Sequence, residues 1–131
     1  MIKLPIPTRR GVLAAGLASL ATPALAQQAW SAGRPIEVIV GFAPGGGTDV
    51  MVRALAQMLT PELPGANFVI SNRPGAGGET GYVALQSGRP DGYTLGTINA
   101  PGYVSLGVQR RVRYDRAQIR LIARLVDDPS A

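Results

Sequence analysis

The sequence predicts an α/β domain with a mainly parallel sheet flanked by helices, and three observations support this class. Short β-branched runs of strand length alternate along the chain with segments of helical periodicity. Glycine-rich turns join two of the predicted strands to the helices that follow them. No internal repeat or low-complexity segment interrupts the alternation. Because strands that alternate with helices form βαβ units, the strands are expected to be parallel.

The first predicted strand is residues 35–42, PIEVIVGF, which are rich in β-branched side chains. A helix follows and ends before Pro61. The apolar residues of this helix recur at helical spacing and are predicted to lie in the core: Met51, Leu55, Met58 and Leu59.

The following elements continue the alternation. Residues 67–71, NFVIS, form a second short predicted strand, and residues 79–87 form a short predicted helix that Gly88 ends. Residues 93–98, YTLGTI, are the third predicted strand. Residues 119–126, IRLIARLV, fit either a fourth strand or a helix, and their periodicity does not choose between the two.

Residues 1–26 have the features of a secretory signal peptide. They carry three basic residues and no acidic one, then an apolar stretch, then Ala-Leu-Ala, after which we expect cleavage. The apolar stretch, residues 11–21, is too short to span a bilayer, which takes about 20 residues. The pair Arg9-Arg10 fits twin-arginine export and ordinary Sec export equally well. We therefore expect an exported, unlipidated product.

The composition argues against several classes of function. The chain has 13 basic and 8 acidic residues, and ten basic residues remain after the signal peptide, a net charge of +2. This mild charge, with few aromatic residues, argues against nucleic-acid binding. The chain has no cysteine and no histidine, so we expect no disulfide, no metal site and no cofactor. The basic residues of one charged stretch are expected to be solvated: Arg110, Arg111, Arg113 and Arg116.

An exported hydrolase is the main enzymatic alternative. A Ser-His-Asp triad needs histidine, which the chain lacks. No G-x-S-x-G turn surrounds any serine after the signal peptide: Ser31, Ser71, Ser87, Ser105 and Ser130. We therefore expect a protein that is not an enzyme.

The stretch GFAPGGGTD, residues 41–49, predicts a binding loop at the carboxyl edge of the sheet. Open α/β sheets bind ligands at this edge. A helix that begins there presents free N–H groups and a positive dipole end, and glycines let an anion approach the backbone. The alternative is structural: Thr48 or Asp49 is only the N-cap of the helix, and the glycines only allow a tight turn.

A carboxylate fits this loop better than a nucleotide phosphate does. The spacing resembles the phosphate loop G-x-x-x-x-G-K-[ST], but Gly47 stands where the lysine belongs. The only lysine of the chain, Lys3, lies in the signal peptide. The dinucleotide pattern G-x-G-x-x-G fails at Val50.

A second glycine-rich turn, residues 72–78, again follows a predicted strand and precedes a predicted helix. It should therefore open on the same edge as the first turn. Arg73 fits a carboxylate clamp, but its place before Pro74 favours a role in bracing the loop through a local salt bridge.

Three segments together resemble a known family. They are RPIEVIVGFAPGGGTDVMVRALAQ, VISNRPGAGGETGYVAL and GRPDGYTLGTI, which span residues 34–98. Their order and spacing are similar to those of the extracytoplasmic substrate-binding proteins of tripartite tricarboxylate transporters, the Bug/TctC-type receptors. A cleavable signal peptide is also usual in that family.

The resemblance implies a periplasmic-binding-protein-like, flytrap α/β lobe that closes with a second lobe on a small organic carboxylate. It also implies that the receptor delivers this ligand to the membrane permease subunits. We expect a monomer in the periplasm that binds no nucleic acid. The domains implied are a signal peptide at 1–26, a linker at 27–33 and a partial first lobe at 34–131, a fragment that stops before the second lobe. Two alternatives stay open: a nonfunctional truncated remnant, and a ligand-sensing receptor for a membrane kinase.

The family holds its ligand carboxylate through loop amides, a hydroxyl and bridging water. Carried over by motif position, Thr48 would offer its hydroxyl and N–H, and Asp49 would cap the helix or accept from a ligand amine. The full set of ligand-binding residues implied by the resemblance is Phe42, Gly46, Gly47, Thr48, Asp49, Gly75, Ala76, Gly77 and Thr97.

Overall fold

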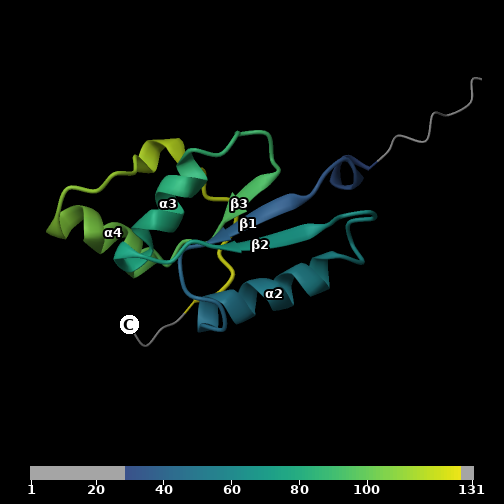
Figure 1. Ribbon diagram of the computed structural model, residues 1–131, viewed down its shortest axis with the longest axis horizontal. Helices are drawn as coiled ribbons and strands as arrows, with labels where there is room; N and C mark the ends of the chain where they lie inside the picture. Colours follow the sequence, from purple (N-terminus) through teal and green to yellow (C-terminus); the bar gives the residue numbers. More distant parts are fainter. Residues whose placement is uncertain (1–28, 128–131) are drawn as a thin grey trace, which may run out of the picture.

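The computed structural model describes residues 29–127 (Figure 1). The predicted signal peptide lies outside these residues. The regular elements are, in chain order, β1 (Ile36–Val40), α2 (Gly47–Leu59), β2 (Phe68–Asn72), α3 (Glu79–Gln86), β3 (Thr94–Gly96) and α4 (Ala100–Gln109), with short 3-10 turns at Trp30–Ala32, Ala76–Gly78 and Arg116–Gln118.

The three strands form one parallel sheet in the order β2-β1-β3. β1 pairs with β2 along its whole length, from Ile36 opposite Phe68 to Val40 opposite Asn72. This confirms the predicted α/β class with a parallel sheet flanked by helices.

The helices cover both faces of the sheet. The chain moves outward from β1 to β2 and then returns across β1 to β3, and both crossovers are expected to be right-handed. Two right-handed crossovers in opposite directions put their helices on opposite faces. Figure 1 shows this arrangement, with α2 on one side of the sheet and α3 and α4 on the other.

The buried core has two parts. Around the sheet, Ile36, Ile39 and Val40 of β1 are buried together with Val52 of α2. Away from the sheet, three tyrosines form an aromatic cluster: Tyr82, Tyr103 and Tyr114. The Tyr103 and Tyr114 rings are stacked with their centroids 5.0 Å apart, and Tyr82 meets both edge-on. This cluster fixes α4 against α3.

Most predicted elements are confirmed, and the differences have local reasons. The first strand ends at Val40 rather than residue 42, because Gly41 and Phe42 already turn toward α2. β3 is only three residues long, since its ladder with β1 covers Glu37 to Ile39. Met58 was wrongly placed in the core: its side chain is 71% exposed, on the outer face of α2.

Residues 119–126 form neither the strand nor the helix that their sequence allowed. The segment is irregular and has no ladder partner in the described part of the chain. Leu125 lies beside α2 at an apolar hollow lined by Met51, Ala54, Leu55 and Met58.

α4 was missed because its sequence, APGYVSLGVQ, contains proline and glycine. Pro101 lies in its first turn, where the missing N–H breaks no helical hydrogen bond. Packing of Tyr103 and Leu106 against the aromatic cluster then stabilises a helix that its local propensity does not favour.

The turn at Trp30–Ala32, within the predicted linker at residues 27–33, is docked on the rest of the domain. The Ser31 hydroxyl is buried and donates to the Pro64 carbonyl at 3.0 Å. Trp30 contacts Tyr93 edge-on, and the Tyr93 hydroxyl donates to the Trp30 carbonyl. These contacts hold the turn at Trp30–Ala32 against the amino-terminal edge of the sheet.

Candidate functional site

Three loops leave the sheet at one edge. Because β1, β2 and β3 are parallel, the loops 41–46, 73–78 and 97–99 all start at their carboxyl ends. The strand order reverses direction at β1, which is where open α/β sheets form a crevice for ligands. All of the residues assigned to the site from the sequence lie on these loops or in the first turn of α2.

The first loop presents free backbone donors at the start of α2. The helix begins at Gly47 and its N-cap is Gly46, so neither Thr48 nor Asp49 is the N-cap residue. The N–H of Gly46 already donates to the Ala43 carbonyl at 3.2 Å. The N–H groups of Gly47 and Thr48 have no partner within the helix, because they belong to its first turn. These two donors therefore face the carboxyl edge.

Asp49 is committed to bonds within the protein. Its side chain is 2% exposed, and one carboxylate oxygen accepts from the Gly45 N–H at 2.8 Å and from Arg53 Nε at 2.9 Å. The other oxygen accepts from Asn72 Nδ2 at 2.9 Å. The Arg53 guanidinium first, then the Gly45 amide and Asn72, hold the pKa of Asp49 well below its usual range. Asp49 thus closes the turn before α2, and its carboxylate is occupied without any ligand amine.

Asn72 belongs to this site although sequence reasoning assigned it no role. It is the last residue of β2, and its side-chain amide donates both to the Phe42 carbonyl, at 3.1 Å, and to Asp49. Its carbonyl oxygen accepts from Arg53 at 3.3 Å. An asparagine directly after the second predicted strand, at the start of a glycine-rich turn, was the only signal in the sequence.

The second loop has an unusual backbone. Gly75, Ala76, Gly77 and Gly78 all have positive φ, and Ala76 is the only non-glycine residue with positive φ in the described part of the chain. The carbonyl of Ala76 accepts from Arg110 at 3.3 Å. Gly75 and Gly77 are exposed at the edge, as the site assignment requires.

Two glycines of this region allow two backbone segments to pack closely together. A Cβ on Gly81 would lie 2.6 Å from the Gly41 Cα, and a Cβ on Gly41 would lie 3.0 Å from the Gly78 carbonyl oxygen. The start of α3 therefore meets the end of β1 backbone to backbone. This contact brings the first two loops together.

Glu79 directly follows the second loop, and its contacts hold the end of that loop in place. Its side chain is buried, and its carboxylate accepts from the backbone N–H of Arg113 at 2.7 Å and pairs with Arg110 at 2.5 Å. The Arg113 amide and the Arg110 guanidinium lower the pKa of Glu79. Two of the four arginines that were expected to be simply solvated thus have a structural partner, although their side chains remain largely exposed.

The third loop completes the edge. The Thr97 N–H donates to the Ile39 carbonyl at 3.0 Å, which holds the loop against β1. The Thr97 hydroxyl is buried and has no hydrogen-bond partner within residues 29–127. Asn99 donates to the Thr48 hydroxyl at 3.4 Å, so the third loop touches the first turn of α2.

Arg73 forms no salt bridge within the described residues. Its Nε donates to the Ser71 hydroxyl at 3.1 Å, and its side chain is exposed. The local salt bridge favoured from the sequence is therefore absent among these residues, and the guanidinium adds positive charge beside the second loop.

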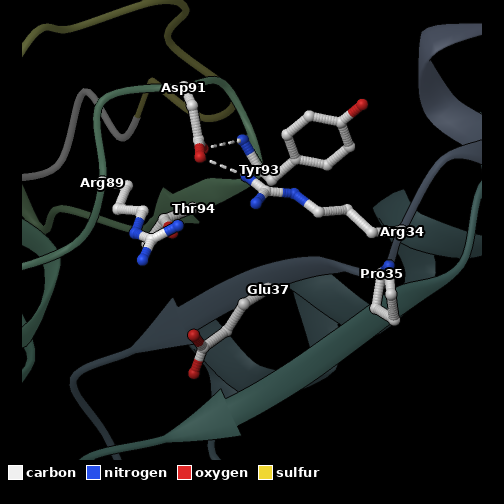
Figure 2. A pocket seen from close by; sticks show the side chains of 7 residues that line it. All are labelled: Arg34, Pro35, Glu37, Arg89, Asp91, Tyr93 and Thr94. Atoms are coloured by element: carbon white, nitrogen blue, oxygen red, sulfur yellow. Dashed lines mark hydrogen bonds and ion pairs between the residues drawn. The ribbon is translucent and has the colours of Figure 1, made fainter.

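A separate hollow of about 260 Å³ lies at the opposite, amino-terminal edge of the sheet (Figure 2). Arg34 forms an ion pair with Asp91 there and lies over the Tyr93 ring, 3.9 Å from its centroid. The Arg34 side chain lowers the pKa of Asp91. Glu37 of β1 lines the other side. These contacts join the starts of β1 and β3 and lie apart from the glycine-rich loops.

Comparison with known proteins decides the family. Residues 50–131 match the family described as the tripartite tricarboxylate transporter family receptor, TctC. The chain belongs to this family. The resemblance read from residues 34–98 is thereby confirmed, and the match extends through α4 to the last residue of the chain.

Two curated relatives illustrate the likeness. A UPF0065 protein in the gbd 5′ region of Cupriavidus necator is 40% identical over 97 residues, 72% of this chain and 29% of the relative. Protein BugT of Bordetella pertussis is 46% identical over 83 residues, 62% of this chain and 25% of the relative. The chain thus spans less than a third of the length of these relatives.

Two solved structures align with about half of the chain. One, titled as a periplasmic transporter, shares 45% identity with a TM-score of 0.47, over 49% of this chain and 21% of that one. The periplasmic binding protein BugD shares 42% identity with a TM-score of 0.45, over 47% of this chain and 20% of that one.

Residues 29–127 lack two further features. None of the helices there has the length and apolar character to cross a membrane. No cluster of three or more acidic side chains suited to a metal ion occurs in the same range.

Proposed function

We propose that this member of the TctC receptor family acts in the periplasm as a solute-binding receptor, holds a small organic carboxylate at the carboxyl edge of its sheet, and delivers it to a tripartite tricarboxylate transporter. One observation carries the proposal. The free N–H groups of Gly47 and Thr48, at the start of α2, face the edge where all three parallel strands end.

The chemistry of this edge suits an anion. Free amides and the positive end of the α2 dipole favour negative charge. Asp49, the carboxylate in the first turn of α2, is neutralised by Arg53, and the guanidinium of Arg73 is exposed beside the second loop. A carboxylate needs only a few hydrogen bonds, which the amides and the Thr48 hydroxyl supply.

The proposal is tested by removing one donor without altering the helix. Gly47 is the first residue of α2, where proline is well tolerated, and Gly46 before it has φ −72° and ψ 163°, a conformation that proline accepts in its predecessor. A Cβ on Gly47 meets no atom within 4 Å. Gly47→Pro therefore deletes the N–H, whereas the matched control Gly47→Ala keeps it.

Calorimetric titration with succinate and citrate should show binding by the wild type and by Gly47→Ala. Gly47→Pro should bind about tenfold more weakly, because a ligand carboxylate loses a charge-assisted hydrogen bond. Dimethyl succinate, which lacks the charge, should not bind. Equal affinity of the proline and alanine variants would contradict the assignment of Gly47, and failure of the wild type to bind either acid would contradict the proposed ligand class.

A further inference from the structure

Asn72 joins the two glycine-rich loops through a single side chain. One amide proton is donated to the Phe42 carbonyl of the first loop, and the other to Asp49 in the first turn of α2. Asn72 itself is the residue from which the second loop leaves β2. One amide group therefore bridges the exit of β2 to the loop and helix that follow β1.

The bonding pattern specifies asparagine. The amide nitrogen faces two oxygen acceptors, and the amide oxygen faces the Arg53 guanidinium at 3.3 Å. Aspartate has no proton to donate to Phe42 and would set its charge against Asp49. Alanine would leave the Phe42 carbonyl and one oxygen of the Asp49 carboxylate without these partners.

The same bonds order the free donors of the candidate site. Asp49 holds the Gly45 N–H at 2.8 Å, and Gly45 to Gly47 form the turn that aims the first amides of α2. If Asn72 and Arg53 fix the Asp49 carboxylate, that turn has one conformation before any ligand arrives. A preorganised site binds more tightly because less conformational freedom is lost on binding.

We propose that Asn72 is a positioning residue for the carboxylate site, which locks the first and second loops together through Phe42 and Asp49 so that the α2 amides are preorganised for ligand. This inference rests on the proposed function for its effect on affinity. Its effect on the conformation of the ligand-free loop is independent of that function.

The test compares Asn72→Ala with Asn67→Ala in the full chain. Asn67 directly precedes β2 at the opposite edge of the sheet, and its side chain makes no hydrogen bond within residues 29–127, so it is a matched control. Hydrogen–deuterium exchange at the Gly45 amide, followed by NMR without ligand, should be at least about tenfold faster in Asn72→Ala than in the wild type, because Asp49 is no longer held. The amides of β1 should be unchanged, and Asn67→Ala should match the wild type throughout.

Succinate titration gives the second readout. Affinity should fall about tenfold in Asn72→Ala and remain unchanged in Asn67→Ala. Unchanged exchange at Gly45, or unchanged affinity in a wild type that binds, would overturn the proposal. A wild type that binds neither succinate nor citrate refutes the proposed function, and Gly45 exchange then still decides the role of Asn72.

A second variant keeps the test decisive if Asn72→Ala does not fold. Arg53→Met removes the half-exposed guanidinium from the same network and leaves the buried side chains in place. Exchange at Gly45 should be faster in Arg53→Met than in the wild type, because Asp49 loses one of the two side chains that hold it. No rise at Gly45 in Arg53→Met would then overturn the proposal.

Discussion

Two buried carboxylates, Asp49 and Glu79, stand at the starts of α2 and α3 and organise the loops before them. Each lies in a first helical turn, where the helix dipole favours negative charge. Each also accepts a backbone N–H from another segment and pairs with arginine. Both therefore act as structural anchors in the ligand-free protein.

The lowered pKa values of these groups predict acid sensitivity. A carboxyl whose pKa is lower in the folded state than in the unfolded state stabilises the fold at neutral pH, and this contribution is lost as pH falls below the unfolded value. The urea midpoint should thus drop from about pH 5 downward. Glu79→Gln should be less stable than the wild type at pH 7 and should lose less stability on acidification.

Glu62→Gln is the matched control for that series, because Glu62 is exposed and makes no ion pair within residues 29–127. Its urea midpoints should follow those of the wild type from pH 7 to pH 3. If Glu79→Gln showed the same loss on acidification as the wild type, the buried ion pair would not explain the acid sensitivity.

Helical glycines provide a second residue-scale prediction. Gly81→Ala should lower the free energy of unfolding by about 2 kcal/mol or more, because its methyl group would collide with the Gly41 backbone. Gly107→Ala, at an exposed position of α4, should instead raise it by about 0.5–1 kcal/mol through helix propensity. Urea unfolding of both variants measures the change in the free energy of unfolding. No change in Gly81→Ala would contradict the close approach of α3 to β1.

At the scale of elements, α2 is held to the sheet by a narrow buried face. Val52 is 2% exposed, whereas Met58 is 71% exposed on the same helix. Helical periodicity correctly predicted α2, but it included Met58 in the apolar face. Met58 lines the apolar hollow beside Leu125 and stays largely exposed, so this part of the apolar pattern remains open to solvent.

Alanine substitutions should show that Val52 and Met58 contribute differently to the free energy of unfolding. Val52→Ala should lower the free energy of unfolding by about 2 kcal/mol, since it removes buried apolar surface and leaves a cavity. Met58→Ala should change it by less than about 0.5 kcal/mol. Thermal and urea unfolding provide the measurement, and comparable losses in both variants would show that the outer face of α2 is covered in solution.

At the scale of the molecule, the two edges of the sheet have different roles. The amino-terminal edge is closed by contacts among Trp30, Tyr93, Arg34 and Asp91. The carboxyl edge carries the glycine-rich loops and the free amides of α2. The contacts that close the amino-terminal edge and the proposed binding site therefore lie at opposite ends of the same three strands.

The irregular segment at residues 119–126 adds apolar surface to the described molecule. Leu121 and Ile122 are 74% and 79% exposed. Replacing both by asparagine should leave the free energy of unfolding within about 0.5 kcal/mol of the wild type, because neither side chain is packed. Sedimentation velocity should show less concentration-dependent association in the double variant. A marked loss of stability would mean that the segment is packed in solution.

The sequence was sufficient for features that depend on neighbours along the chain. Periodicity located α2 and α3, β-branched runs located the three strands, and glycines marked the two loops at the carboxyl edge. It was not sufficient for α4, whose proline and glycine weaken the local signal and whose stability comes from packing against Tyr82 and Tyr114.

By itself, then, the sequence determined the α/β class, the family and the edge at which a ligand is expected, since turn chemistry and periodicity are local properties. Only the tertiary structure decided that Asp49 is committed to Gly45, Arg53 and Asn72, and that Glu79 holds the backbone of Arg113. The Asn72 and Arg113 contacts join residues 23 and 34 positions apart. The order β2-β1-β3 brings Asn72 beside the first loop, and the packing of α4 on α3 brings Arg113 to Glu79. Neither spacing has a periodic signature that a sequence could show.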